Sequence, residues 1–163
     1  MKIAYLALGS NIGDRLANIA DARARLAASE IKILRESSIY ETAPREILDQ
    51  PYFLNQVIEV ETDAMPRALL SKLKKIERAM GRKKIVAKGP RVIDLDIVLF
   101  GNFVVAVEGL EIPHPRMSER RFVLEPLAEL APDLRHPITK KTIREHLAQV
   151  GDQAVRKYSG TIV

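Results

Sequence analysis

The order of its periodic segments constrains the fold of this chain more than any other feature of the sequence. Alternation of apolar and polar residues predicts strands, and apolar residues three or four positions apart predict helices. Strand, helix, strand, strand, helix and strand are predicted in turn at residues 2–10, 11–29, 31–42, 52–62, 66–80 and 91–100. This βαββαβ order is the ferredoxin-like α+β arrangement, an antiparallel sheet with two helices on one face. We expect the other face and the loops to be free to hold a site.

Further segments are predicted after this core. Residues 103–112 are expected to form a strand that returns as a hairpin beside the strand before it. A loop and a short helix are expected over residues 113–134, and a final amphipathic helix over residues 140–150. The tail, residues 152–163, is left as a surface strand or a disordered end.

Length and composition predict one soluble domain, residues 1–163. Hydrophobic residues make up 47% of the chain and charged residues 29%, which is a balance typical of globular proteins. Because no run of about 18 apolar residues and no signal-peptide pattern occurs, we expect a cytoplasmic protein with no membrane partner. We also expect a monomer. The absence of cysteine excludes disulfides and thiol nucleophiles.

The positive charge leaves several classes of partner open. The net charge is +5, and lysine and arginine are concentrated in residues 72–91. Such a run suits nucleic acid, an anionic membrane surface or a small anionic substrate, and it is also typical of a solvated helix face beside a basic loop. Charge alone does not choose among these partners.

The segment GSNIGDR begins at the end of the first predicted strand, and its first glycine predicts that the chain turns at Gly9 toward the following helix. Ser10 or Asn11 is the expected N-cap of the next helix, because hydroxyl and amide oxygens accept the free N–H groups there. A lone glycine turn is a weak signal for phosphate binding, and no G-x-x-x-x-G-K-[ST] motif occurs. Three scattered histidines without an HExxH pattern argue against a zinc site.

Two aspartates interrupt the apolar strand RVIDLDIVLF, residues 91–100. Alternation places Ile93, Leu95, Ile97 and Leu99 on one face of this strand, and Val92, Asp94, Asp96 and Val98 on the other. The two carboxylates start roughly 7 Å apart, so their oxygens can converge on one cation. They fit a Mg²⁺ site that is shared with substrate phosphates, and they equally fit a solvated edge strand paired with nearby lysines and arginines. These ten residues leave both interpretations open.

Phe53 and Asn55 share one face of the predicted strand 52–62. An aromatic ring beside an amide suits a flat heterocycle, which stacks on the ring and forms hydrogen bonds with the amide. An ordinary core phenylalanine and an asparagine bonded to the backbone would give the same pattern.

Five segments together closely resemble the 6-hydroxymethyl-7,8-dihydropterin pyrophosphokinases of folate biosynthesis. The segments are GSNIGDR, Y-x-T-x-P, DQPYFLNQV, GPRVIDLDI and IPHPRMSERRFVLEPL, and the match runs from about Lys2 to Asp133. The resemblance implies a ferredoxin-like core and a Mg²⁺-dependent diphosphotransferase. Such an enzyme moves the pyrophosphoryl group of ATP to the pterin hydroxymethyl oxygen and releases AMP, with two Mg²⁺ ions. ATP and the pterin are then the expected partners, with no nucleic acid.

The resemblance also implies roles for individual residues. Asp94 and Asp96 would be the metal ligands, and together with Arg82 and Arg91 they would form the catalytic set. The pterin would lie between Phe53 and Phe122, and Asn55 and the backbone near Thr42 would bind its polar edge. ATP would contact Glu77, Lys84, Arg91, His114 and Arg120. Arg82 and Arg91 would be the mobile and anchored cations around the transferred phosphates, in a basic loop that closes over ATP.

Several positions depart from the family pattern. Ala87 and Lys88 stand where the family often has Arg-Trp, so an aromatic contact from this loop to the pterin is in doubt. Lys84 stands where arginine is frequent, and it supplies charge without a bidentate fork. Arg45-Glu46 and Pro115 also replace residues that are common in the family. No general base is identifiable.

Two alternatives come from other functional classes. A ferredoxin-like RNA-binding module would share the fold and the basic surface, but the chain lacks the aromatic RNP pattern that such modules need. Its strand carboxylates would also repel nucleic-acid phosphates. A non-catalytic interaction domain is the second alternative, and the presence of Asp94, Asp96, Arg82 and Arg91 argues against it.

Overall fold

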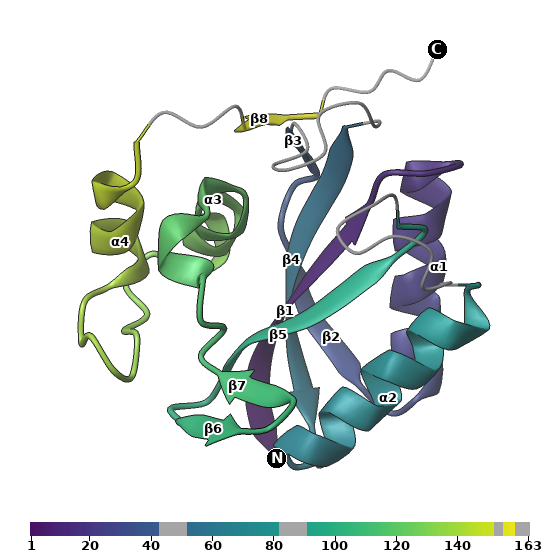
Figure 1. Cartoon of the computed structure of the whole chain (residues 1–163), viewed down its shortest axis with the longest axis horizontal. Helices are drawn as coiled ribbons and strands as arrows, with labels where there is room; N and C mark the ends of the chain where they lie inside the picture. Colours follow the sequence, from purple (N-terminus) through teal and green to yellow (C-terminus); the bar gives the residue numbers. More distant parts are fainter. Residues whose placement is uncertain (43–51, 82–90, 152–154, 159–163) are drawn as a thin grey trace.

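The computed structural model describes residues 1–42, 52–81, 91–151 and 155–158. Within this part of the chain, six strands form one antiparallel sheet in the order β5-β1-β4-β3-β8, with β2 also paired to β4 (Figure 1). Their bounds are β1 Lys2–Ser10, β2 Lys32–Glu36, β3 Tyr40–Thr42, β4 Phe53–Thr62, β5 Asp94–Phe100 and β8 Val155–Lys157. The core order, with β1 and β4 central, confirms the predicted ferredoxin-like α+β class.

The second predicted strand, residues 31–42, is wrong as one continuous element. It is divided into β2 and β3, and both parts pair with β4. Ser37 lies at the break, where its amide donates to the carbonyl of Val57 at 2.9 Å. The Ser37 hydroxyl accepts the Val57 amide at 3.0 Å, in place of a backbone carbonyl. A side chain therefore substitutes for one step of the ladder, and the strand is interrupted there.

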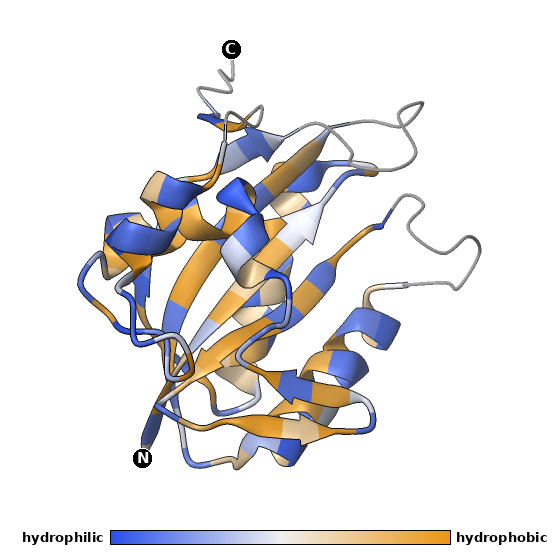
Figure 2. Cartoon of the chain, turned by 60° about the vertical axis from the view of Figure 1, so that its left-hand side comes forward, coloured by the Kyte–Doolittle hydropathy of each residue, from blue (hydrophilic) through white to orange (hydrophobic). Residues whose placement is uncertain are grey.

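Two helices, α1 (Arg15–Ala28) and α2 (Pro66–Ala79), pack on one face of the sheet, as the sequence predicts (Figure 1). Their apolar stripes meet the even-numbered core residues of β1 and β4 in one large hydrophobic cluster. Figure 2 shows hydrophobic residues along the strands that these helices cover. Fully buried members of the cluster include Leu6, Ile19, Ile58 and Leu73.

The predicted N-cap of α1 is wrong. Asp14 caps the helix, and its Oδ1 accepts the amide of Ala17 at 3.1 Å. Ser10 and Asn11 are engaged elsewhere: Ser10 accepts from the side chain of Asn18, and Asn11 accepts the amide of Arg91. Gly13, with a φ of 72°, turns the chain between them and the helix.

The opposite face of the sheet is partly covered, contrary to the expectation that it is free. Helices α3 (Arg121–Leu130) and α4 (Ile143–Gln149) pack there around a second hydrophobic cluster that contains Tyr5, Val57 and Leu124 (Figure 1). Glu129 of α3 helps to fix this packing, because its carboxylate accepts the hydroxyl of Tyr40 at 2.7 Å.

Leu99 belongs to this second cluster, so the prediction that it shares a face with Ile97 is wrong. The register between β1 and β5 shifts between Tyr5 and Leu6, which is a β-bulge. Val98 and Leu99 therefore both contribute to the second cluster, while Ile97 and Phe100 contribute to the first.

Residues 103–112 contain the predicted C-terminal hairpin, but the prediction that they pair with β5 is wrong. Strands β6 (Val105–Val107) and β7 (Leu110–Ile112) pair with each other in a separate hairpin. Gly109, with a φ of 79°, lies in the tight turn that this pairing requires. A 3-10 turn, η1 (Met117–Glu119), then leads to α3. In the part of the chain that the structure describes, no helix has the length and apolar character of a membrane span.

Replacement of Phe100 by alanine should lower the free energy of unfolding by about 3–5 kcal/mol, because the ring is fully buried and a cavity would remain. Val104 lies four residues away and is 57% exposed. Val104→Ala is therefore a matched control, and it should change the free energy of unfolding by less than about 0.5 kcal/mol. Urea titration measures both values. Equal losses in the two variants would contradict the assigned core.

Candidate active site

One row of residues crosses the sheet from strand to strand. It brings together side chains that were predicted separately, as metal ligands and as pterin ligands. Gly9 of β1 lies opposite Asp94 of β5 on one side and opposite Asn55 of β4 on the other. Asn55 in turn lies opposite Tyr40 of β3. Residues opposite each other in antiparallel strands project from the same face. The candidate metal ligand and the candidate pterin ligand are therefore on one face with only Gly9 between them.

Gly9 is within β1, and the prediction of a turn at this residue is wrong. A Cβ atom at this position would lie 3.2 Å from Oδ1 of Asn55 and 3.6 Å from Cδ1 of Phe53. Glycine thus leaves open the surface between the carboxylates and the aromatic ring. Sequence reasoning missed this role, because a glycine at the end of an apolar strand has the same pattern as a turn.

Asp94 and Asp96 project from the same face, as alternation predicts, and both are half-buried. Burial, the charge of Asp94 and the charge of Glu77 raise the pKa of Asp96 to about 7, while Lys74 and Arg120 oppose the shift. The raised pKa shows that it is unfavourable for both carboxylates to be ionised at once. Such a pair suits a divalent cation, whose charge would offset their repulsion.

The donor set fits Mg²⁺, which commonly uses one or two carboxylates and keeps its other positions for water and phosphate oxygens. Among the described residues, no group of three or more His, Cys, Asp or Glu side chains has the arrangement of a metal cluster. Asp94 and Asp96 would thus supply the protein ligands and leave open positions for a substrate.

Glu77 lies beneath the edge of β5, where only 2% of it is exposed. Its Oε2 accepts the backbone amide of Leu95 at 2.8 Å, and its Oε1 lies 3.6 Å from Nζ of Lys74. Leu95 stands between the two aspartates, so this bond fixes the backbone from which both project. The predicted contact of Glu77 with ATP stays a prediction.

Arg91 is held through its backbone by Asn11, which is fully buried. The amide of Asn11 donates to the carbonyl of Arg91 at 3.0 Å, and the amide of Arg91 donates to Oδ1 of Asn11 at 2.7 Å. This two-point contact fixes the backbone at Arg91, three residues before β5 begins at Asp94. Sequence reasoning missed this contact, because asparagine after Gly-Ser is equally typical of a helix cap.

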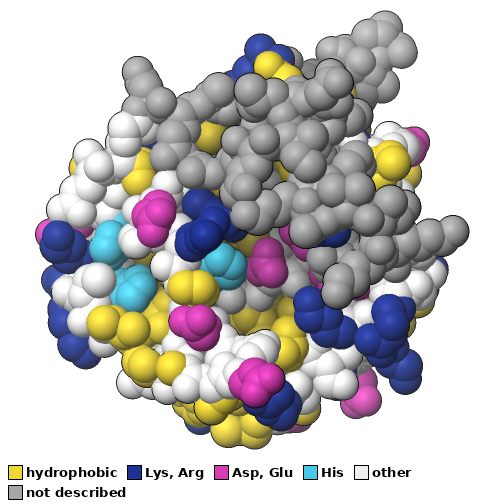
Figure 3. Space-filling model, viewed as in Figure 1, with side chains coloured by type: hydrophobic (Ala, Val, Ile, Leu, Met, Phe, Trp, Pro, Cys, Tyr) yellow, Lys and Arg dark blue, Asp and Glu magenta, His cyan; other side chains and the backbone are white. Residues whose placement is uncertain are grey.

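His114 and Arg120, which lie on either side of η1, are near enough to the aspartates to interact with them electrostatically. Burial, followed by the charges of Arg120 and Arg116, lowers the pKa of His114, and Asp94 opposes this shift. Nδ1 of His114 accepts the amide of Arg116 at 3.1 Å, which leaves Nε2 as the donor of the neutral ring. Figure 3 shows acidic, basic and histidine side chains close together near the middle of this face.

Arg120 lies over the ring of Phe122, with its guanidinium carbon 5.4 Å from the ring centroid. It also contributes to the electrostatic environment of Asp96 and His114. One arginine thus lies beside a candidate ring-binding phenylalanine and near the candidate metal ligands.

Asn55 and Thr42 form a buried pair, in which Nδ2 of Asn55 donates to Oγ1 of Thr42 at 2.8 Å. This bond fixes the amide orientation and keeps Oδ1 near Gly9. Arg82 and Lys84, and with them the departures at Lys88, Arg45 and Glu46, lie outside the described residues, so their predicted roles are not placed.

The fold defines the class to which the chain belongs. The crystal structure of Plasmodium falciparum HPPK-DHPS with pteroate matches with a TM-score of 0.72 over 91% of this chain and 42% of that chain, at 20% identity. The wild-type crystal structure of the same protein matches with a TM-score of 0.72 over 91% of this chain and 41% of that chain, at 19% identity. These matches show a shared HPPK-type α+β fold.

The chain belongs to the 7,8-dihydro-6-hydroxymethylpterin-pyrophosphokinase (HPPK) family, whose model matches residues 5–132. The resemblance inferred from the five motifs is thereby confirmed. A 2-amino-4-hydroxy-6-hydroxymethyldihydropteridine pyrophosphokinase of Methylorubrum extorquens is 42% identical over 96% of this chain and 99% of its own length.

Other relatives are much longer than this chain. The folic acid synthesis protein fol1 of Schizosaccharomyces pombe is 48% identical over 97% of this chain, which spans only 22% of that protein. The mitochondrial folate synthesis bifunctional protein of Pisum sativum is 48% identical over 77% of this chain and 24% of its own length.

Because Asp96 is buried near Asp94 and Glu77, the free energy of unfolding is predicted to change with pH. The folded protein retains a proton on Asp96 up to about pH 7, whereas the unfolded chain releases it near pH 3.8, the ordinary pKa of an aspartate. The folded state therefore binds more protons between these values, and the free energy of unfolding contributed by this group falls as pH rises. In metal-free buffer at pH 8, Asp96→Asn should raise Tm by about 3 °C or more.

That gain in Tm should shrink as the pH is lowered toward 4, because the folded wild type keeps the proton on Asp96 and the unfolded chain begins to bind it there. Asp133→Asn is the control, because the Asp133 carboxylate is 80% exposed and pairs with an exposed Arg144. Differential scanning calorimetry gives both Tm values. A fall in Tm on Asp96→Asn at pH 8 would refute the conclusion that burial, together with the charges of Asp94 and Glu77, destabilises the ionised Asp96.

Proposed function

We propose that the chain transfers the pyrophosphoryl group of ATP to the hydroxymethyl oxygen of 6-hydroxymethyl-7,8-dihydropterin. The observation that carries this proposal is the row Asp94, Gly9 and Asn55, which sets a carboxylate pair beside a buried amide and an aromatic ring. Membership of the HPPK family supports it. A bacterial relative that carries the name of this activity is covered by the chain over 99% of its length.

The reaction has a simple balance. The hydroxymethyl oxygen attacks the β-phosphorus of ATP, and the bond from that phosphorus to the oxygen shared with the α-phosphorus breaks. AMP leaves with the shared oxygen, the pterin retains the diphosphate, and the hydroxyl proton is released to solvent. Positioning of the two substrates and compensation of phosphate charge supply most of the catalysis in such a transfer.

The pterin ring is proposed to lie between Phe53 and Phe122, with Asn55 and the backbone near Thr42 at its polar edge. Support comes from the fixed Asn55 amide, which projects Oδ1 near the open surface at Gly9. A ring bound there would have its hydroxymethyl group within reach of phosphates held near Asp94, because Asn55 and Asp94 are each only one strand spacing, about 4.8 Å, from Gly9.

The ATP phosphates are proposed to bind on the aspartate side of the row. Asp94 and Asp96 would hold two Mg²⁺ ions, which when bound offset negative charge on the phosphate oxygens. The phosphates or the nucleotide would be contacted by Arg91, His114 and Arg120. Glu77 would hold in place the strand that carries the aspartates. Arg82 and Lys84 are included on the family resemblance alone, with Arg82 as the cation that closes over the transferred group.

The nucleotide product tests the reaction directly. ATP, Mg²⁺ and 6-hydroxymethyl-7,8-dihydropterin are incubated with the protein, and the products are separated by ion-exchange chromatography. We expect AMP and the pterin diphosphate in equal amounts, and chelation of Mg²⁺ should stop the reaction. ADP as the product would replace the proposal with a simple kinase, and absence of turnover would refute it.

Asp94→Asn should lower kcat by about two to three orders of magnitude, because it removes half of the carboxylate charge proposed to hold the metal ions. The fold should be retained, since Asp94 is half-buried and asparagine has the same shape. Asp133→Asn again serves as the exposed carboxylate control and should retain wild-type kcat. Steady-state assays compare the two variants, and equal activity in Asp94→Asn would contradict the metal assignment.

A further inference from the structure

Glu41 of β3 is partly buried on the reverse face of the sheet, directly beside a residue of the proposed pterin site. Thr42 is the next residue in β3, and its hydroxyl accepts the amide of Asn55 on the site face. Successive residues of a strand project to opposite faces, so Glu41 faces the α1 side. The Glu41 side chain is only 13% exposed, which is unusual for a carboxylate unless it is paired.

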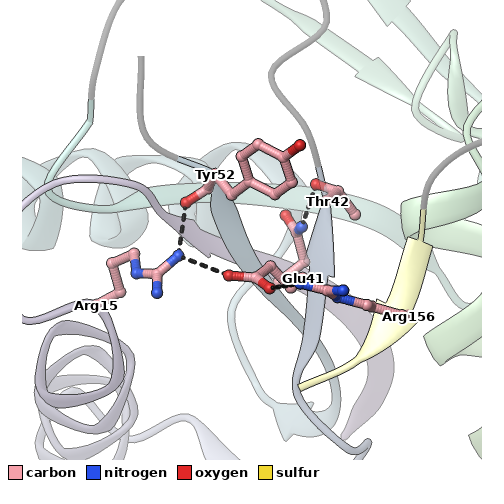
Figure 4. Close-up of polar contacts among 6 residues, drawn as sticks. Arg15, Glu41, Thr42, Tyr52 and Arg156 are labelled. Carbon is pink, nitrogen blue, oxygen red and sulfur yellow. Dashed lines mark hydrogen bonds and ion pairs between the residues drawn. The ribbon is translucent and has the colours of Figure 1, made fainter. Parts of the chain in front are cut away.

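Both carboxylate oxygens of Glu41 are engaged by arginines from distant parts of the chain (Figure 4). Oε2 lies 3.2 Å from Nη1 of Arg15, and Oε1 lies 2.9 Å from Nη2 of Arg156. The hydrogen bond from Arg156, and after it that from Arg15, lowers the pKa of Glu41 against the opposing effect of burial. The carboxylate is therefore ionised at neutral pH and holds two cations at once.

Arg15 is the first residue of α1, where the helix dipole disfavours a positive charge. Its guanidinium has another use, because Nη1 also donates to the carbonyl of Tyr52 at 2.9 Å. Tyr52 immediately precedes β4, which carries Phe53 and Asn55. One side chain from α1 thus joins the end of β3 to the start of β4, the two strands that supply the proposed pterin ligands.

Arg156 comes from β8, the tail strand whose role the sequence left open. β8 pairs with β3 so that Arg156 lies opposite Glu41, and the amide of Tyr158 donates to the carbonyl of Ile39 at 2.8 Å. The ring of Tyr158 also lies beneath the guanidinium of Arg15, 5.7 Å from its central carbon. The tail and the helix therefore converge on the same carboxylate.

We propose that Arg15, Glu41 and Arg156 are positioning residues for the pterin, which act from the reverse face by fixing β3 so that Thr42 holds the Asn55 amide in its binding orientation. This inference rests on the proposed function. It adds a role for the C-terminal strand in substrate binding, although none of the three side chains belongs to the face that would bind the ring.

Arg156→Gln is the variant that tests this role, because the Arg156 side chain is 75% exposed and its loss leaves no cavity. We expect the Kd of the pterin, measured by fluorescence titration in the presence of a non-hydrolysable ATP analogue, to rise about three- to tenfold. The Kd of the ATP analogue and Tm should remain near the wild-type values, because an exposed ion pair contributes little to overall stability. Arg156→Lys retains the charge and should recover most of the pterin affinity.

A double-mutant cycle separates the coupled network from independent effects. In a Glu41→Gln background, adding Arg156→Gln should raise the pterin Kd little further. Arg144→Gln is the matched control, since it breaks an exposed arginine–carboxylate pair with Asp133 away from the sheet edge, and it should leave both Kd values unchanged.

The binding measurements test the positioning role and the proposed function separately. A wild-type protein that does not bind the pterin overturns the proposed function and this inference with it. Wild-type binding that is unchanged in Arg156→Gln overturns the inference alone. A parallel rise in the Kd of the pterin and of the ATP analogue would also overturn it, because the network would then act on the whole fold.

Discussion

The pairing of β1 with β4 on one side and β5 on the other is the interaction on which the site depends. Each strand alone carries only half of a site: β5 has the carboxylates, and β4 has the aromatic ring and the amide. β1 fixes their relative register through hydrogen bonds along nearly its full length, and Gly9 keeps the surface between them open. A change in either ladder would therefore move two ligand-binding regions relative to each other.

The sequence predicted the features that depend on periodicity and on motif spacing. The βαββαβ order, the two helices on one face and the shared face of Asp94 and Asp96 all follow from local patterns of two or 3.6 residues. The family likewise followed from motifs that lie at nearly constant spacing along the chain. Local pattern was sufficient because these elements bury one continuous apolar face or stripe each.

The features that the sequence did not predict depend on contacts between distant segments. Asn11 is typical of a helix cap until its partner Arg91 is known, eighty positions further along the chain. Ser37 interrupts a strand because its hydroxyl meets an amide of β4. Glu41 has its arginines at positions 15 and 156, and no spacing within one element relates them. Such polar contacts carry no period, so they require the folded chain to be recognised.

The bulge between β1 and β5 gives the strand that carries the aspartates two independent halves. Up to Ile97 the strand follows the alternation that exposes Asp94 and Asp96, and from Val98 onward the phase of its side chains is reset. Substitutions among the apolar residues after Ile97 therefore need not change the face from which the two carboxylates project. Deletion of Val98 would remove the bulge and leave regular alternation from Asp94 to Phe100, so the carboxylates and the apolar end would both keep their faces.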